Sequence, residues 1–155
     1  MTRAYLSLGS NVGDRAHHLT RGVTLMSAGE AARVSRVYQS APVGGVAQAD
    51  FWNLVLEVET AVTPAELLAR AHAAETAARR TREVRWGPRT LDVDIVWIDG
   101  VVHDDAQLTV PHPRMFERNF VLVPLRELRA DLVDDDALAR GEGLVRVLGT
   151  LESLQ

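Results

Sequence analysis

The chain has 155 residues, a mass of 17.0 kDa, a net charge of −4 and a pI near 5.7. This length suits one domain with a hydrophobic core, so we expect a single domain over residues 1–155. The acidic balance argues against general nucleic-acid binding, which needs a basic face. No apolar run is long enough to predict a membrane span or a secretory segment.

Two residue types are absent from the sequence. There is no cysteine, which excludes disulfides and thiol chemistry and is compatible with a cytoplasmic protein. All 17 basic residues are arginine, which excludes a P-loop lysine and a lysine Schiff base. Genomic codon composition is a sufficient explanation for this bias. Its chemical consequence is a supply of planar guanidinium groups, which suit phosphate oxygens.

The first predicted elements are a strand and a helix joined by a glycine-containing turn. Alternation over residues 3–8 places Tyr5 and Ser7 on one face of the strand. The turn at 9–14 matches neither the dinucleotide-binding nor the P-loop pattern, so we interpret it as a structural turn. Asp14 is the expected N-cap of the helix that follows. The apolar stripe of this helix consists of Ala16, Leu19, Val23 and Met26.

A strand, a long loop and another strand come next. We expect a strand over residues 32–39 and a loop over 40–50, and loops of this length are often functional. Residues 51–62 form the next predicted strand, in which Phe51 and Asn53 share the face away from the core. An aromatic ring beside an amide can stack on and read a flat heterocycle, although both residues also suit the ordinary edge of a core.

A helix and an arginine-rich stretch follow. The capping box at 63–66 has proline at the first helical position, and its helix should run to about Arg79. On this helix His72 and Glu75 lie three residues apart, a spacing that suits a metal pair but is more typical of a solvated face. The stretch at 80–89 then supplies four more arginines.

The next strand carries two aspartates among apolar residues. Asp92 and Asp94 point to one face of the strand, and Val96 and Ile98 follow on the same face. The other face carries Leu91, Val93, Ile95 and Trp97. Two like charges side by side on such a strand are unfavourable unless a cation lies between them. Oxygen ligands without Cys or His favour Mg²⁺ over zinc, and Mg²⁺ usually binds one or two carboxylates together with substrate phosphates.

The remaining sequence predicts shorter elements. The dipeptide at 99–100 is typical of a two-residue hairpin turn, and residues 107–114 form an extended, proline-bounded segment. We expect residues 115–128 to be mostly helical, with Pro124 as the candidate position of a break. The aspartates at 134–136 should cap a last helix, and residues 138–151 complete the fold with a helical pattern that two glycines weaken.

These motifs together resemble one known family, the 6-hydroxymethyl-7,8-dihydropterin pyrophosphokinases of the folate pathway. The likeness is most specific at Arg85–Ile95, read as Arg-Trp-Gly-Pro-Arg-Thr-Leu-Asp-Val-Asp-Ile, where the family pattern runs without a break. It covers nearly the whole chain, with further matching segments at 5–11, 38–44, 48–53, 80–82, 108–114 and 118–125. Three positions depart from the pattern, namely Arg79 for Gly, Phe51 for a common Tyr, and Gln107 where some members carry Arg.

The resemblance implies both a fold and a reaction. The fold would be α+β and ferredoxin-like, with helices packed on a mostly antiparallel sheet in α/β/α layers. The reaction would be transfer of the pyrophosphoryl group of ATP to the hydroxymethyl group of the pterin, which gives AMP and the pterin diphosphate. Two Mg²⁺ ions would assist. The implied partners are these small molecules alone, with no nucleic acid or membrane, and the chain would act as a monomer.

The same resemblance implies the site residues. Asp92 and Asp94 would hold the two Mg²⁺ ions, and with Arg80 and Arg89 they would form the catalytic set. The implied ATP-binding residues are Glu75, Arg80, Arg82, Trp86, Arg89, Ile95, Thr109, His112 and Arg118. The implied pterin-binding residues are Ser40, Ala41, Val43, Phe51, Asn53, Asp92 and Phe120.

Two other function classes compete with this interpretation. A ferredoxin-like module that binds RNA or a small regulator would display aromatic and basic residues on its sheet, and its RNA affinity would fall steeply with salt. A metal-dependent nuclease using the same aspartate pair normally needs further carboxylates or a general base within reach. Neighbouring acids on the strand argue against the first class, and the lack of an obvious third carboxylate argues against the second.

Overall fold

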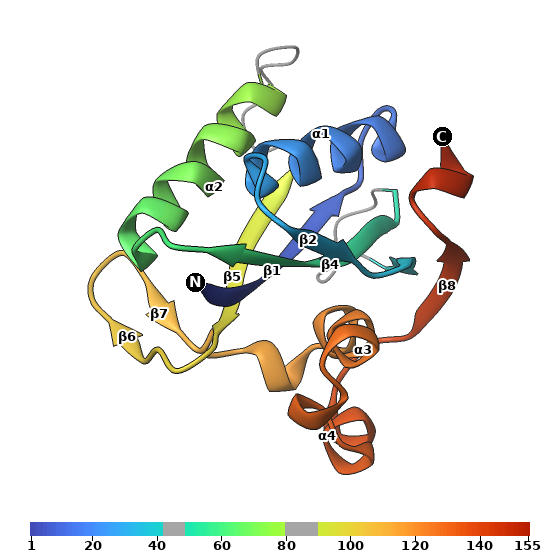
Figure 1. The fold of residues 1–155 in the computed structure, drawn as a ribbon. Helices are drawn as coiled ribbons and strands as arrows, with labels where there is room; N and C mark the ends of the chain where they lie inside the picture. The colour runs from blue at the N-terminus through green and yellow to red at the C-terminus, as the bar shows by residue number, and fades with distance from the viewer. Residues whose placement is uncertain (42–48, 80–89) are drawn as a thin grey trace.

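A single sheet organises the chain in the computed structural model, which describes residues 1–41, 49–79 and 90–155 (Figure 1). Its strands follow the order β5-β1-β4-β3-β8, with β2 also paired to β4, and all these pairings are antiparallel. The strands are β1 (Thr2–Ser10), β2 (Ala32–Val34), β3 (Val37–Ser40), β4 (Phe51–Thr60), β5 (Asp92–Ile98) and β8 (Val145–Gly149).

Helices cover both faces of the sheet, so the predicted α/β/α layering is confirmed (Figure 1). One layer consists of α1 (Arg15–Ser27) and α2 (Pro64–Arg79), and the other is built around α3 (Asn119–Leu128) with α4 (Asp135–Arg140) beside it. The shorter elements are β6 (His103–Asp104), β7 (Thr109–Val110), η1 (Met115–Glu117), η2 (Ala130–Leu132) and η3 (Glu152–Leu154). None of the helices in the described ranges has the length and apolar character needed to cross a membrane.

The core is divided by the sheet into two clusters, as alternation along β1 predicts. Leu6 and Leu8 pack beneath α1 and α2, whereas Tyr5 packs beneath α3. Both predicted helix caps are confirmed. Asp14 accepts a hydrogen bond from the His17 backbone N–H at 3.1 Å, and the Thr63 hydroxyl accepts one from Glu66 N–H at 3.1 Å.

The predicted strand at 32–39 is wrong in one respect, because it is interrupted between β2 and β3. The Ser35 hydroxyl accepts a hydrogen bond from the Val55 backbone N–H at 2.9 Å and donates one to Arg36 O at 2.8 Å. A side chain thus takes the place of a backbone partner in the ladder, which ends β2 at Val34.

The predicted faces of β5 are correct as far as Val96, which packs in the α3 layer. Ile95 lies opposite Leu6, but Trp97 lies opposite Tyr5, so the strand carries a bulge at Val96. Trp97 therefore packs in the α3 layer and Ile98 in the α1/α2 layer, which is the reverse of the prediction.

The turn at Asp99 and Gly100 forms, but the predicted hairpin does not. Val101 N–H donates to Ile98 O at 3.1 Å, and Gly100 has a φ of 71°. After the turn, β6 pairs with β7 instead of returning along β5. The edge of β5 is occupied by a later segment, because His112 N–H donates to Val96 O at 2.9 Å.

Two details near the C-terminus differ from the prediction. Residues 115–128 are mostly helical, as predicted, but the break lies at Arg118, which is extended, while Pro124 is buried inside α3. The segment at 145–149 is not helical but forms β8, which pairs with β3. Between them the chain passes close to the start of α3, where a Cβ added to Gly141 would lie 2.0 Å from Oδ1 of Asn119. A helix continued through this point would collide with α3.

A buried carboxylate ties the sheet to the end of α3. Glu57 accepts hydrogen bonds from the Tyr5 hydroxyl at 2.6 Å and from Arg33 at 2.9 and 2.8 Å. Arg129 donates to the same Tyr5 hydroxyl at 3.1 Å and to Asp99 at 2.7 and 2.9 Å. The hydrogen bonds from Arg33 are the main reason that the pKa of Glu57 lies below its ordinary value, and they outweigh the cost of burial.

The lowered pKa of Glu57 predicts acid sensitivity. A depressed folded-state pKa gives stability that is complete above the ordinary value of 4.5 and is lost as the pH falls through the folded value. We expect Glu57→Gln to lower the free energy of unfolding at pH 7 by about 2 kcal/mol and to flatten its decline below about pH 5. Urea titrations at several pH values measure both. Glu59→Gln, which removes an exposed partner of Arg3, should cost less than about 0.5 kcal/mol, and an equal loss in both variants would contradict this explanation.

Candidate active site

Three polar or small residues line up across neighbouring strands on the α3 side of the sheet. Gly9 of β1 lies opposite Asn53 of β4 on one side and opposite Asp92 of β5 on the other. Residues in register on antiparallel strands point to the same face. The predicted amide and carboxylate therefore flank a glycine that has no side chain to separate them.

Gly9 leaves room for the Asn53 side chain because it has no side chain of its own, a feature that was not predicted from the sequence. A Cβ added to it would lie 2.9 Å from Oδ1 of Asn53 and 3.5 Å from Cδ1 of Phe51. The Asn53 side chain is buried and donates to the Ser40 hydroxyl at 2.8 Å, so it has little room to move. A glycine at the end of a predicted strand is the pattern that could have indicated this close approach.

Asp92 and Asp94 share one face of β5, as predicted. Asp92 is half-buried and Asp94 is exposed. The backbone between them is fixed from α2, because the Glu75 carboxylate accepts a hydrogen bond from Val93 N–H at 3.1 Å. Thus Glu75, predicted at the ATP site, orients the strand that carries both aspartates.

A small hollow opens beside Asp94, and its lining includes His112 and Arg118. Burial, together with the nearby positive charges of Arg118 and Arg114, lowers the pKa of His112 below 6.5, while Asp94 opposes this shift. The ring is therefore neutral at pH 7. Its Nδ1 accepts a hydrogen bond from Arg114 N–H at 3.1 Å, which leaves the proton on Nε2.

Two predicted aromatic residues belong to elements that meet on this face. Phe51 begins β4 beside Gly9, and Phe120 lies in the first turn of α3, whose body packs on β4 and β3. The Arg118 guanidinium carbon is 5.7 Å from the centroid of the Phe120 ring. Both rings are half-buried, which leaves part of each ring surface accessible to a flat ligand.

The other predicted site residues are placed as follows. Ala41 is exposed directly after β3, and the Thr109 hydroxyl on β7 donates to Asp104 at 3.2 Å. The Ile95 side chain is buried in the α1/α2 layer, so only its backbone is available to a site on the α3 face. The predicted site residues that lie outside the described ranges are Val43, Arg80, Arg82, Trp86 and Arg89.

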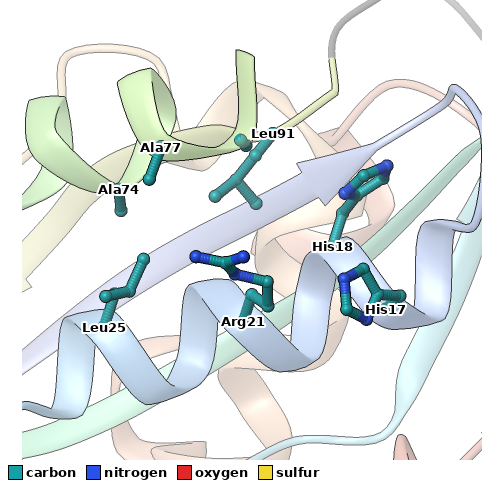
Figure 2. A pocket seen from close by; sticks show the side chains of 8 residues that line it. His17, His18, Arg21, Leu25, Ala74, Ala77 and Leu91 are labelled. Atoms are coloured by element: carbon teal, nitrogen blue, oxygen red, sulfur yellow. The ribbon is translucent and has the colours of Figure 1, made fainter. Parts of the chain in front are cut away.

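A second hollow lies in the opposite layer, between α1 and α2 (Figure 2). His18, Arg21 and Leu25 line it from α1, and alanines line it from α2. None of the predicted site residues within the described ranges lines it. Among the described residues, the predicted metal-binding aspartates and the pterin-binding Asn53 therefore lie on the α3 face, whereas Glu75 lies on α2 in the opposite layer.

The donor set on β5 fits magnesium. It consists of two carboxylates on a shared face, one of them exposed, and hard oxygen donors are what Mg²⁺ prefers. Across residues 1–41, 49–79 and 90–155, no three His, Cys, Asp or Glu side chains gather as a complete metal cage. Such a pair suits an ion whose remaining ligands are substrate phosphates and water. The other candidate metal pair does not form a site. His72 is exposed on α2, and Glu75 accepts a hydrogen bond from Val93 N–H.

Comparison with known proteins shows which family the chain is similar to. Residues 5–130 match the family model described as 7,8-dihydro-6-hydroxymethylpterin-pyrophosphokinase (HPPK). A relative from Bacillus subtilis (strain 168), named 2-amino-4-hydroxy-6-hydroxymethyldihydropteridine pyrophosphokinase, is 47% identical over 128 residues, which span 81% of this chain and 77% of the relative. A relative from Pisum sativum, named folate synthesis bifunctional protein, mitochondrial, is 36% identical over 96% of this chain and 29% of its own length.

A solved structure supports the fold independently. The crystal structure of Plasmodium falciparum HPPK-DHPS superposes with a TM-score of 0.63 at 13% identity, over 99% of this chain. The chain spans 43% of that longer polypeptide. Sequence and fold together show that the chain belongs to the 7,8-dihydro-6-hydroxymethylpterin-pyrophosphokinase family.

Proposed function

We propose that this chain transfers the pyrophosphoryl group of ATP to the hydroxymethyl group of 6-hydroxymethyl-7,8-dihydropterin, giving AMP and the pterin diphosphate. The observation that supports this most directly is the row formed by Asn53, Gly9 and Asp92. It places a group able to read a heterocycle and a group able to bind a metal–phosphate unit on one face, separated by a single strand. The names of the relatives describe the same reaction class.

The pterin end of the site is assigned to residues of β3, β4 and α3. Phe51 and Phe120 stack on the two sides of the ring, and Asn53 hydrogen-bonds its edge while Ser40 fixes the amide. The backbone of Ala41 completes this part of the proposal. Buried polar groups matched to a ligand give specificity, because a ring lacking the matching donors would leave the amide unpaired.

The ATP end is assigned to the carboxylates and to the hollow beside them. Asp92 and Asp94 would hold Mg²⁺ beside the phosphates of ATP, and the metal would supply charge neutralisation and help to align the transferred group. The neutral His112 donates from Nε2 to a phosphate oxygen, and Arg118 adds positive charge at the same hollow. Two ions is the number implied by the resemblance, and the roles of Arg80, Arg82, Trp86 and Arg89 remain predictions from the sequence.

The products test this proposal directly. Incubation with ATP, Mg²⁺ and the hydroxymethyl pterin should give AMP and pterin diphosphate in equal amounts, measured by ion-exchange chromatography. Omission of the pterin is the control and should stop AMP release. Formation of ADP, or AMP release that does not depend on pterin, would exclude pyrophosphoryl transfer.

The proposal also includes a monomeric protein. Most described residues of the proposed site lie on one sheet or on the helices that cover it, so we expect a single chain to be able to form the site. Light scattering of the purified protein, with turnover measured at the same concentrations, checks this expectation.

A further inference from the structure

Arg15 contacts both chain neighbours of Phe51 from the opposite side of the sheet. Its Nη1 donates to the Asp50 carbonyl at 2.8 Å, and its guanidinium carbon lies 4.6 Å from the centroid of the Trp52 ring. Trp52 packs in the α1/α2 layer, whereas Phe51 points to the α3 face. Arg15 therefore fixes the backbone just before Phe51 and the side chain just after it.

The same short stretch of chain has further polar anchors. Asn11 donates from its side-chain amide to Ala49 O at 3.1 Å, and Gln39 donates to the Asp50 carboxylate at 2.6 Å. Arg146 of β8 in turn donates to Gln39 at 3.1 Å. Hydrogen bonds from Asn11, just after β1, and from Gln39 of β3 thus converge on the two residues that lead into β4, and Arg146 of β8 supports Gln39.

Phe51 needs such support because sheet pairing holds it weakly. The described pairing of β1 with β4 ends at Ser10 and Trp52, so Phe51 is paired only with Ser40 of β3. On its other side the ring approaches Gly9, which has no side chain to confine it. A terminal strand residue paired on one side frays easily unless contacts outside the ladder hold it.

The chemistry of arginine suits this double contact. A planar guanidinium can lie over an indole ring and at the same time donate in its own plane to a carbonyl. A lysine ammonium is a point charge without that plane, so it cannot satisfy both contacts in one position.

We propose that Arg15 is a positioning residue for pterin binding: by holding Asp50 and Trp52 it sets the place of the Phe51 ring. This inference rests on the proposed function. It assigns Arg15, which touches neither proposed substrate, a specific effect on one of them. Its loss should weaken pterin binding through Phe51 and leave ATP binding unchanged.

The test measures the two substrates separately. We expect Arg15→Ala to raise the KM for pterin about tenfold, with the KM for ATP and kcat within about twofold of the wild type, because uniform binding of ground and transition states is lost. Arg15→Lys should give an intermediate rise. Arg21→Ala is the matched control, because Arg21 lies on the same helix but lines the α1–α2 hollow (Figure 2). It should leave both KM values unchanged.

A double-mutant cycle separates positioning from general damage. If Arg15 acts through Phe51, then adding Arg15→Ala to Phe51→Ala should change the KM for pterin by less than about twofold. A full further tenfold rise in the double variant would overturn the proposal, as would an unchanged KM in Arg15→Ala or an equal rise for ATP. Should Arg15→Ala fail to fold, Arg15→Lys is run through the same cycle.

The outcome also distinguishes this inference from the proposed function. Pterin binding is measured by the quenching of protein fluorescence. A wild-type protein that binds no hydroxymethyl pterin would contradict the proposed function itself. Wild-type binding that Arg15→Ala and Arg15→Lys both leave intact would contradict only the role given to Arg15.

Discussion

Asp94→Ala should lower kcat for pterin-dependent AMP formation by at least about 1,000-fold, which corresponds to about 4 kcal/mol of transition-state stabilisation. The side chain is exposed on β5, so its removal leaves no cavity and no buried group without a partner. The variant should therefore unfold at the temperature of the wild type. Asp92→Ala should show a similar loss of turnover, because both carboxylates are assigned to the same metal–phosphate unit.

The control for this loss is another exposed aspartate. Asp136 lies in the first turn of α4, away from β5, and Asp136→Ala removes the same charge. It should keep turnover within about twofold of the wild type. Titration calorimetry should show weaker binding of Mg²⁺ with an ATP analogue in Asp94→Ala but not in Asp136→Ala. Turnover that survives in Asp94→Ala would remove this carboxylate from the site.

Gly9→Ala should weaken pterin binding by about 2 to 3 kcal/mol, roughly 30- to 150-fold in Kd, and leave ATP binding almost unchanged. The added methyl group would meet Oδ1 of Asn53 at 2.9 Å, and the amide can retreat only by breaking its 2.8 Å hydrogen bond to Ser40. The conformation of Gly9 itself is not the obstacle, since its φ is outside the left-handed region.

Fluorescence titration with the pterin measures this change, and a second glycine provides the comparison. Gly29 has a positive φ, but a Cβ added there would meet no atom within 4 Å. Gly29→Ala should therefore reduce stability through backbone strain while the Kd for pterin stays constant. A Gly9→Ala variant that binds the pterin normally would show that Asn53 does not read the ring.

Much of the fold follows from local pattern in the sequence. Alternation alone predicted which face of the sheet Tyr5, Asn53, Asp92 and Asp94 would occupy, because a strand's geometry fixes the direction of each side chain. The caps at Asp14 and Thr63 were equally local, since each needs only a side chain and the backbone three residues ahead.

The errors arose where one segment depends on a distant one. The bulge at Val96 exists in the pairing of β5 with β1, and β8 is a strand because β3 offers it an edge. Neither partner can be identified from the segment itself. The role of Gly9 was missed for the same reason, because its position between Asn53 and Asp92 depends on the register of three strands.

Because the two helix layers lie on opposite faces of the sheet, a label can be attached to one layer away from the site proposed on the other. Since the sequence has no cysteine, Leu25→Cys would introduce its sole thiol on α1, at a position that is 38% exposed and on the far side of the sheet from both aspartates. A fluorophore or surface tether attached there could report on single molecules during turnover without standing in the path of either substrate.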